Sequence, residues 1–121
     1  MALVLIVDDE PGMHNTIRRI LEGCGHRVLN AQDGKVGLQV LKESHPDVAL
    51  VDLFMPEKEG IQTIREMRAE RPAVKIIAMS GGGKFGINLL SGLEFLGADS
   101  TLEKPFRKDQ LLGEIDRVLS R

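Results

Sequence analysis

Residues 3–10 read Leu-Val-Leu-Ile-Val-Asp-Asp-Glu, a short apolar run that passes directly into acidic residues. A run of this length, rich in β-branched residues, is typical of a buried strand. It is far too short for a membrane span or for the hydrophobic part of a signal sequence. The stretch therefore predicts a strand over residues 3–7 that delivers Asp8, Asp9 and Glu10 to its carboxyl end.

Further short apolar runs follow this one, and segments of helical period separate them. The predicted strands are residues 3–7, 27–31, 48–51, 74–79 and 100–102, and the predicted helices are residues 12–24, 34–44, 58–70, 85–97 and 107–120. The turn residues Asp33-Gly34 and the pair Arg71-Pro72 agree with two of these boundaries. Regular alternation of strands and helices predicts an α/β fold with a parallel sheet covered on both faces.

Composition narrows the classes of function. The 121 residues match the usual size of one domain, so residues 1–121 are expected to form a single domain. The net charge is −2, and the basic surface of a nucleic-acid binder is missing, so we expect no direct contact with nucleic acid. The chain lacks Trp and Tyr, which argues against an aromatic platform for stacking a ligand.

The single cysteine and the three histidines give no sign of a site of their own. Cys24 has no partner for an internal disulfide, which favours a cytoplasmic location. It ends an apolar helical stripe, so it is expected to be buried. His14, His26 and His45 lack the spacing of metal ligands and are expected to be solvated.

Reactive side chains gather where the predicted strands end, which is where parallel sheets bind their ligands. Asp8 and Asp9 follow the first strand, Asp52 the third, Ser80 the fourth and Lys104 the fifth. Crowded carboxylates repel one another unless a cation joins them, and oxygen ligands of this kind suit Mg²⁺. The pattern predicts a phosphoryl-transfer site in which Asp52 attacks, while Lys104 and Ser80 hold phosphoryl oxygens.

Several segments, taken in order, resemble the response-regulator receiver domain of two-component signal transduction, a CheY-like superfamily. They are Val7–Glu10, Asp52–Pro56, Ser80-Gly81, Gly97–Asp99 and Lys104–Phe106. The resemblance implies a doubly wound, five-stranded parallel sheet of the flavodoxin-like (βα)5 type with strand order 2-1-3-4-5. It also implies a phosphoacceptor switch that changes its partner-binding surface, with only self-catalysed phosphotransfer and auto-dephosphorylation, and so not an enzyme in the ordinary sense.

By the same resemblance, Asp52 would be the phosphoacceptor. Asp9 and Asp52 would bind Mg²⁺ directly, the Phe54 backbone carbonyl would add a third protein ligand, and Asp8 would act largely through water. Leu102 departs from the family pattern, because many receivers have an aromatic residue at this position. An inward turn of a ring on activation is therefore not expected here.

The partners implied are a sensor histidine kinase or a histidine phosphotransfer protein, and a downstream effector protein or domain. A homodimer is a further expectation, through the face made by the predicted helix 85–97, the strand 100–102 and the helix 107–120. No membrane contact is expected.

Three alternatives belong to other classes. A flavodoxin-like cofactor binder would meet repulsion between its phosphate and the acidic loop at residues 8–10. An aspartyl phosphohydrolase usually has a second Asp two residues after the nucleophile, where this chain has Phe54. A receiver that serves only as an interaction module would not need the full set of reactive residues.

Overall fold

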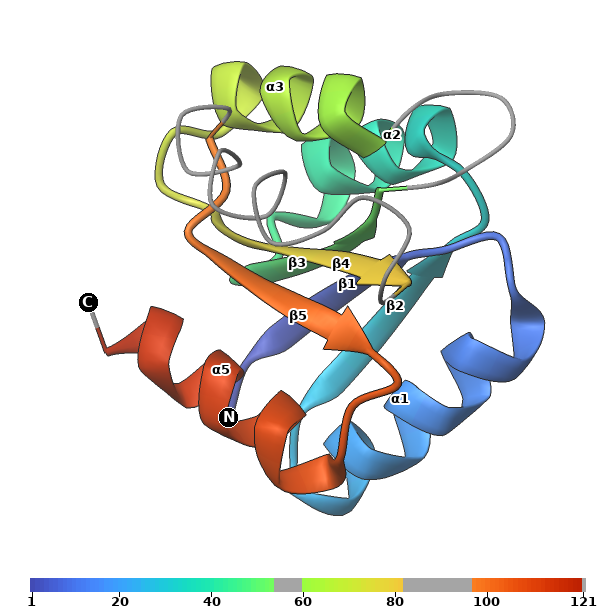
Figure 1. The fold of residues 1–121 in the computed structure, drawn as a ribbon. Coiled ribbons are helices and arrows are strands. Elements are labelled where there is room, and N and C mark those ends of the chain that lie inside the picture. Colours follow the sequence, from blue (N-terminus) through green and yellow to red (C-terminus); the bar gives the residue numbers. More distant parts are fainter. Residues whose placement is uncertain (54–59, 82–96, 121) are drawn as a thin grey trace.

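The computed structural model describes residues 1–53, 60–81 and 97–120, and these form one sheet with helices on both sides (Figure 1). The strands are β1 (Leu3–Val7), β2 (Arg27–Ala31), β3 (Val48–Asp52), β4 (Lys75–Gly81) and β5 (Ser100–Lys104). Every neighbouring pair is parallel, and the order across the sheet is β2-β1-β3-β4-β5. The predicted strand order is therefore confirmed.

The helices lie in two layers. Helices α2 (Gly34–Ser44) and α3 (Gly60–Glu70) cover one face of the sheet, and α1 (Pro11–Gly23) and α5 (Lys108–Leu119) cover the other (Figure 1). The Asp33 carboxylate caps α2 by accepting a hydrogen bond of 2.9 Å from the Val36 amide. The predicted helix at residues 85–97 lies outside the described residues except for Gly97, which is in a turn.

Each face of the sheet has its own apolar core. Alternate strand residues such as Leu5 and Val51 pack in the layer with Leu41 and Ile64 of α2 and α3. The intervening residues pack in the second layer with α1 and α5, where Ile17, Leu21, Leu111, Ile115 and Val118 are fully buried. Burial on both faces explains why the strands read as continuous apolar runs.

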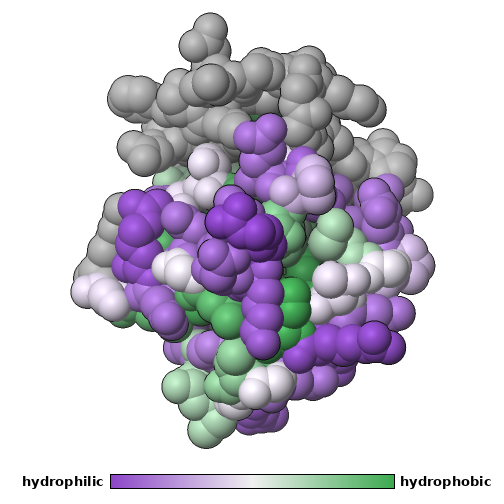
Figure 2. Space-filling model, turned by 60° about the horizontal axis from the view of Figure 1, so that its bottom comes forward, coloured by the Kyte–Doolittle hydropathy of each residue, from purple (hydrophilic) through white to green (hydrophobic). Residues whose placement is uncertain are grey.

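Polar residues cover most of the described surface on the side turned forward in Figure 2, with apolar residues in narrow gaps between them. Only Met1, Val36 and Leu119 are exposed large hydrophobic residues among those that the structure describes. Within the same residues, no helix has both the length and the apolar character needed to cross a bilayer.

Arg68 ties α3 to the amino-terminal edge of the sheet. Its guanidinium donates hydrogen bonds to the carbonyl oxygens of Pro72, Val74 and Gly97 and to the Asp99 carboxylate, at 2.6–3.0 Å. The Asp99 carboxylate also accepts a hydrogen bond from the Ile76 amide. This network fixes the starts of β4 and β5 at the edge opposite to their carboxyl ends.

The prediction that Cys24 is buried is wrong. The structure places Cys24 at the carboxyl-terminal cap of α1, where it is exposed. The buried stripe of α1 ends at Leu21, because the chain leaves the helix after Gly23 and turns through Gly25, whose φ is 87°.

Candidate functional site

Three strands bring charged side chains to one edge of the sheet. Asp8 directly follows β1, Asp52 is the last residue of β3, and Lys104 is the last residue of β5. Side chains alternate between the two faces of a strand, and all three residues continue the alternation of the face covered by α1 and α5. The residues are far apart in the sequence but share one end and one face of the sheet.

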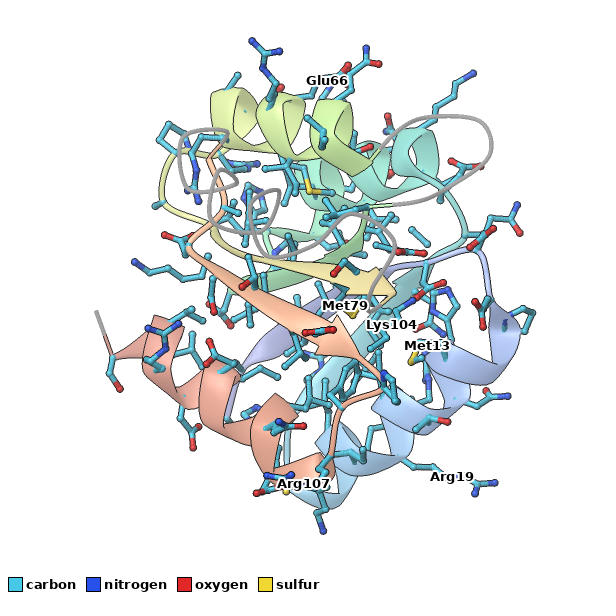
Figure 3. The ribbon with its side chains drawn as sticks, viewed as in Figure 1. Met13, Arg19, Glu66, Met79, Lys104 and Arg107 are labelled. Atoms are coloured by element: carbon cyan, nitrogen blue, oxygen red, sulfur yellow. The ribbon has the colours of Figure 1, made fainter. Side chains whose placement is uncertain are left out.

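Lys104 is the cation of this cluster. Its Nζ lies 2.7 Å from Asp8 Oδ2 and 3.6 Å from Asp52 Oδ2. Figure 3 shows Lys104 at the arrowhead end of the sheet. The exposed fraction of the side chain is 12% for Lys104, 0% for Asp8 and 7% for Asp52, so the ion pairs are shielded from water.

Two opposing effects set the pKa of Lys104. Desolvation alone would lower the pKa of its ammonium group. The hydrogen bond to Asp8 and the negative charges of Asp52, Asp8 and Glu10 outweigh this effect and raise the pKa above the usual value for lysine. Lys104 is therefore positively charged whenever the neighbouring carboxylates are ionised.

The acidic residues have the geometry of a cation site. Asp8, Asp9 and Asp52 each offer a carboxylate oxygen, and these oxygens all lie within 4.8 Å of one another. Ligand atoms around Mg²⁺, at about 2.1 Å from the ion, are separated from one another by roughly 3–4.2 Å. Small side-chain adjustments would let these oxygens share one ion. A metal ion is thus compatible with this cluster, and hard oxygen ligands favour Mg²⁺.

The structure describes some of the other predicted site residues and not others. Ser80 is buried near the end of β4, next to Glu103 in the register with β5, so it lies on the strand between those of Asp52 and Lys104. Phe54 lies outside the described residues. Leu102 is 6% exposed and belongs to the core layer under α1 and α5. The assignment of Ser80 to a phosphoryl oxygen remains a prediction.

The sequence model of the response regulator receiver domain matches residues 4–116. The chain belongs to this family.

Known regulators are similar to this chain in sequence, and solved receiver structures are similar to it in fold. Transcriptional regulatory protein CpxR of Klebsiella pneumoniae is 36% identical over 121 residues, which are 100% of this chain and 50% of CpxR. A CheY-like receiver domain protein of Methanospirillum hungatei superposes with a TM-score of 0.90 at 29% identity, over 99% of this chain and 94% of that one. Chemotaxis protein CheY4 of Vibrio cholerae gives 0.89 at 27% identity, over 98% of each chain. The chain spans about half the length of the curated relatives it matches.

Gly60, which the sequence analysis missed, lies directly against the backbone of the acidic cluster. A Cβ atom at this position would lie 2.2 Å from the carbonyl oxygen of Asp52 and 2.5 Å from Leu53 Cα. The Gly60 amide also donates a hydrogen bond of 3.2 Å to the Leu53 carbonyl oxygen. The start of α3 therefore lies directly against the backbone that holds Asp52, and only glycine permits this approach.

The prediction that His14 is solvated is also wrong. Its exposed fraction is 8%, and its Nε2 lies 2.5 Å from the carbonyl oxygen of Asp8. His14 shares the buried face of α1 with Ile17 and Leu21, at the spacing of three and seven residues that marks one helix face. That spacing was the signal in the sequence that could have revealed its burial.

Proposed function

We propose that this receiver domain, residues 1–121, is a phosphoacceptor switch that is phosphorylated on Asp52 in the presence of Mg²⁺. The observation that supports this most strongly is the cluster itself: three carboxylates with oxygens within 4.8 Å, and a partly buried ammonium that contacts two of them. The Mg²⁺ ligands would be Asp9, Asp52 and the Phe54 carbonyl, with Asp8 acting largely through water. Bound Mg²⁺ would neutralise negative charge on the incoming phosphoryl group.

The reaction is a transfer of a phosphoryl group from a histidine nitrogen to a carboxylate oxygen. The Asp52 oxygen forms a bond to phosphorus as the bond between phosphorus and the donor nitrogen breaks, and the donor imidazole keeps the electron pair. The Lys104 ammonium, fixed between Asp8 and Asp52, attracts a phosphoryl oxygen, and the Ser80 hydroxyl donates a hydrogen bond to another. These residues serve one phosphorylation event at a time, so the domain is a switch that catalyses only its own modification and its reversal.

The partners follow from this chemistry. The donor would be a sensor histidine kinase or a histidine phosphotransfer protein, and both would meet the domain in the cytoplasm. A relative of twice this length is named a transcriptional regulatory protein, which supports an effector protein or domain as the output partner. The domain itself would contact neither nucleic acid nor membrane.

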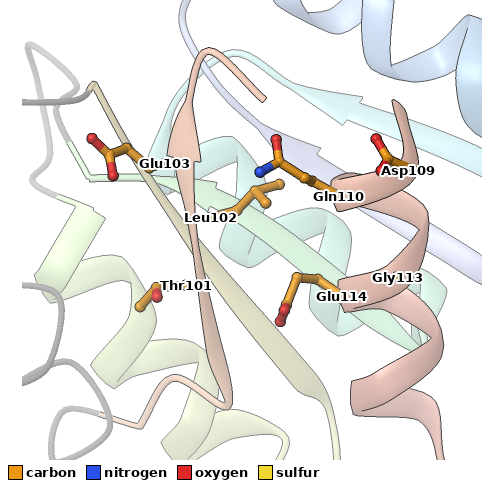
Figure 4. A pocket seen from close by; sticks show the side chains of 7 residues that line it. All are labelled: Thr101, Leu102, Glu103, Asp109, Gln110, Gly113 and Glu114. Carbon is orange, nitrogen blue, oxygen red and sulfur yellow. The ribbon is translucent and has the colours of Figure 1, made fainter. Parts of the chain in front are cut away.

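The face formed by β5 and α5 is the proposed output surface, and a homodimer would use the same face together with the segment 85–97. A recess is lined by residues of β5 and α5, among them Leu102, Gln110 and Glu114. In Figure 4 the side chains of these three residues lie between β5 and α5, whereas the Glu103 side chain lies on the other side of β5. Leu102 is one of the residues that line this recess, and its strand ends at Lys104. Movement of Lys104 toward a phosphoryl group would therefore be transmitted directly to this face.

Incubation with acetyl phosphate and Mg²⁺, followed by intact-protein mass spectrometry, tests the proposal. The wild-type protein should gain the mass of one phosphoryl group, and Asp52→Asn should gain none. Asp116→Asn is the matched control, because Asp116 is an exposed aspartate on α5. Equal modification of the Asp52→Asn variant and the wild type would contradict the proposal.

A further inference from the structure

His14 contacts the backbone carbonyl oxygen of Asp8, and the other polar atoms of Asp8 have other partners among the described residues. The Asp8 amide donates to the Ala31 carbonyl oxygen at 3.1 Å, and Asp8 Oδ1 accepts from the Glu10 amide at 2.9 Å. Asp8 Oδ2 accepts from Lys104 at 2.7 Å. The remaining polar atom, the carbonyl oxygen, contacts His14 Nε2. All four polar atoms of Asp8 thus have partners.

The contact determines which nitrogen of the His14 ring has the hydrogen. A carbonyl oxygen can only accept, so Nε2 of His14 must have the hydrogen and donate it to Asp8. The other ring nitrogen, Nδ1, is buried and has no hydrogen-bond partner among the described residues. A buried nitrogen without a partner lowers stability, and an apolar side chain of similar size would avoid that loss. Packing of α1 against the sheet therefore does not explain why a histidine occupies this position.

The bonded carbonyl oxygen belongs to the peptide unit between Asp8 and Asp9. This unit is planar, so fixing its oxygen also fixes the direction in which the chain enters Asp9. Asp9 is exposed, and its carboxylate is part of the acidic cluster. Met13, the neighbour of His14, lies on α1 at the same end of the molecule as Lys104 (Figure 3).

We infer that His14 is a positioning residue for the cation site: it anchors the Asp8–Asp9 peptide so that both carboxylates face Asp52. This inference rests on the proposed function, because it assigns His14 to the same Mg²⁺ site. Metal ligands commonly depend on such outer contacts, and loss of one weakens binding by about tenfold or more. His14 itself does not touch the reacting atoms.

Two substitutions separate positioning from packing. In His14→Gln the side-chain amide can donate from a position close to that of Nε2, whereas His14→Leu fills the space without a donor. His26→Leu is the matched control, since His26 also has one ring-to-backbone hydrogen bond, from the Ala2 amide to Nδ1 at 3.0 Å, but at the amino end of β1. Mg²⁺ affinity is measured by calorimetry, and thermal unfolding is measured in EDTA.

We expect His14→Leu to weaken Mg²⁺ binding about tenfold, and His14→Gln and His26→Leu to stay within about twofold of the wild type. The thermal unfolding midpoint of His14→Leu in EDTA should not fall to match the loss of Mg²⁺ affinity, because this variant also removes the unpaired Nδ1. Unchanged Mg²⁺ affinity in a folded His14→Leu protein, or equal losses in the Leu and Gln variants, would overturn the inference.

A measurement on the metal-free protein distinguishes this inference from the proposed function. Nitrogen NMR of the His14 ring should show the Nε2–H form, and its absence would refute the contact that the inference needs. If the Leu variant does not fold, this spectrum and the Gln variant decide the question. Wild-type protein that binds no Mg²⁺ would refute the proposed function and, with it, the role of His14. If the wild type binds Mg²⁺ normally and substitution of His14 does not change the affinity, the inference alone is refuted.

Discussion

Replacing Gly60 with alanine would put a Cβ atom 2.2 Å from the Asp52 carbonyl oxygen and 2.5 Å from Leu53 Cα. Both contacts are to backbone, so no side chain can rotate away to relieve them. Either the start of α3 must move outward or the end of β3, with Asp52, must move into the site. The substitution therefore links the packing of a helix to the position of Asp52, the proposed phosphoacceptor.

The magnitude follows from two opposing contributions. An extra methyl group forced into a packed region costs about 1–3 kcal/mol, and contact at 2.2 Å belongs at the upper end of that range. The better helix propensity of alanine returns at most about 1 kcal/mol. We expect the free energy of unfolding to fall by about 2 kcal/mol, as measured by urea unfolding with circular dichroism, since the chain has no Trp.

Gly113→Ala is the matched control. Gly113 lies within α5, and nothing lies within 4 Å of a Cβ atom built on it. Only the helix propensity applies there, so this variant should gain about 0.5–1 kcal/mol. In the folded fraction, Gly60→Ala should also accept less phosphate from acetyl phosphate than Gly113→Ala. Equal stability of the two variants, or full phosphate acceptance by Gly60→Ala, would refute the reasoning.

Two further predictions concern opposite edges of the sheet. Lys104→Met leaves the fully buried Asp8 without its cation and should lower the free energy of unfolding by about 3 kcal/mol in EDTA. The loss should be smaller in Mg²⁺, and an equal loss in both urea titrations would argue against a shared site. Arg68→Lys cannot bridge Gly97 and Asp99 in the same way and should cost about 2 kcal/mol. Its Mg²⁺ affinity should stay that of the wild type, and a change there would contradict the separation of the two edges.

The sequence predicted the positions of the strands well because their apolar runs are buried on both faces, whereas the strand order followed from the resemblance to the receiver family. It placed the ends of three strands too early: β3, β4 and β5 continue through Asp52, Gly81 and Lys104. Polar residues at a strand end give no apolar signal, yet the parallel ladder continues, with Gly81 opposite Lys104. The site residues are therefore held by strand hydrogen bonds, which a reading of hydrophobicity alone does not reveal.

The residues that the sequence did not reveal act through backbone contacts. Gly60 matters because of an approach to Asp52, and His14 matters because of a bond to the carbonyl of Asp8. Neither contact depends on the chemical type of the partner side chain, so no motif encodes it. Both become visible only when α1 and α3 are placed against the sheet.

The charges of the site indicate how Lys104 would serve both the resting domain and the phosphorylated state that we propose. Three carboxylates face one ammonium, which leaves two negative charges, the amount that one divalent cation neutralises. In the structure Lys104 lies nearer to Asp8 than to Asp52, at 2.7 Å against 3.6 Å. A phosphoryl group on Asp52 would replace the single charge of the carboxylate with a phosphate that carries close to two, a net gain of about one negative charge, and would draw Lys104 toward Asp52. Lys104 is the last residue of β5, and β5 also forms the recess against α5. Movement of the ammonium toward Asp52 would therefore pull on this strand. The change of partner by Lys104 is thus a direct physical route from the proposed phosphoacceptor to the proposed output face.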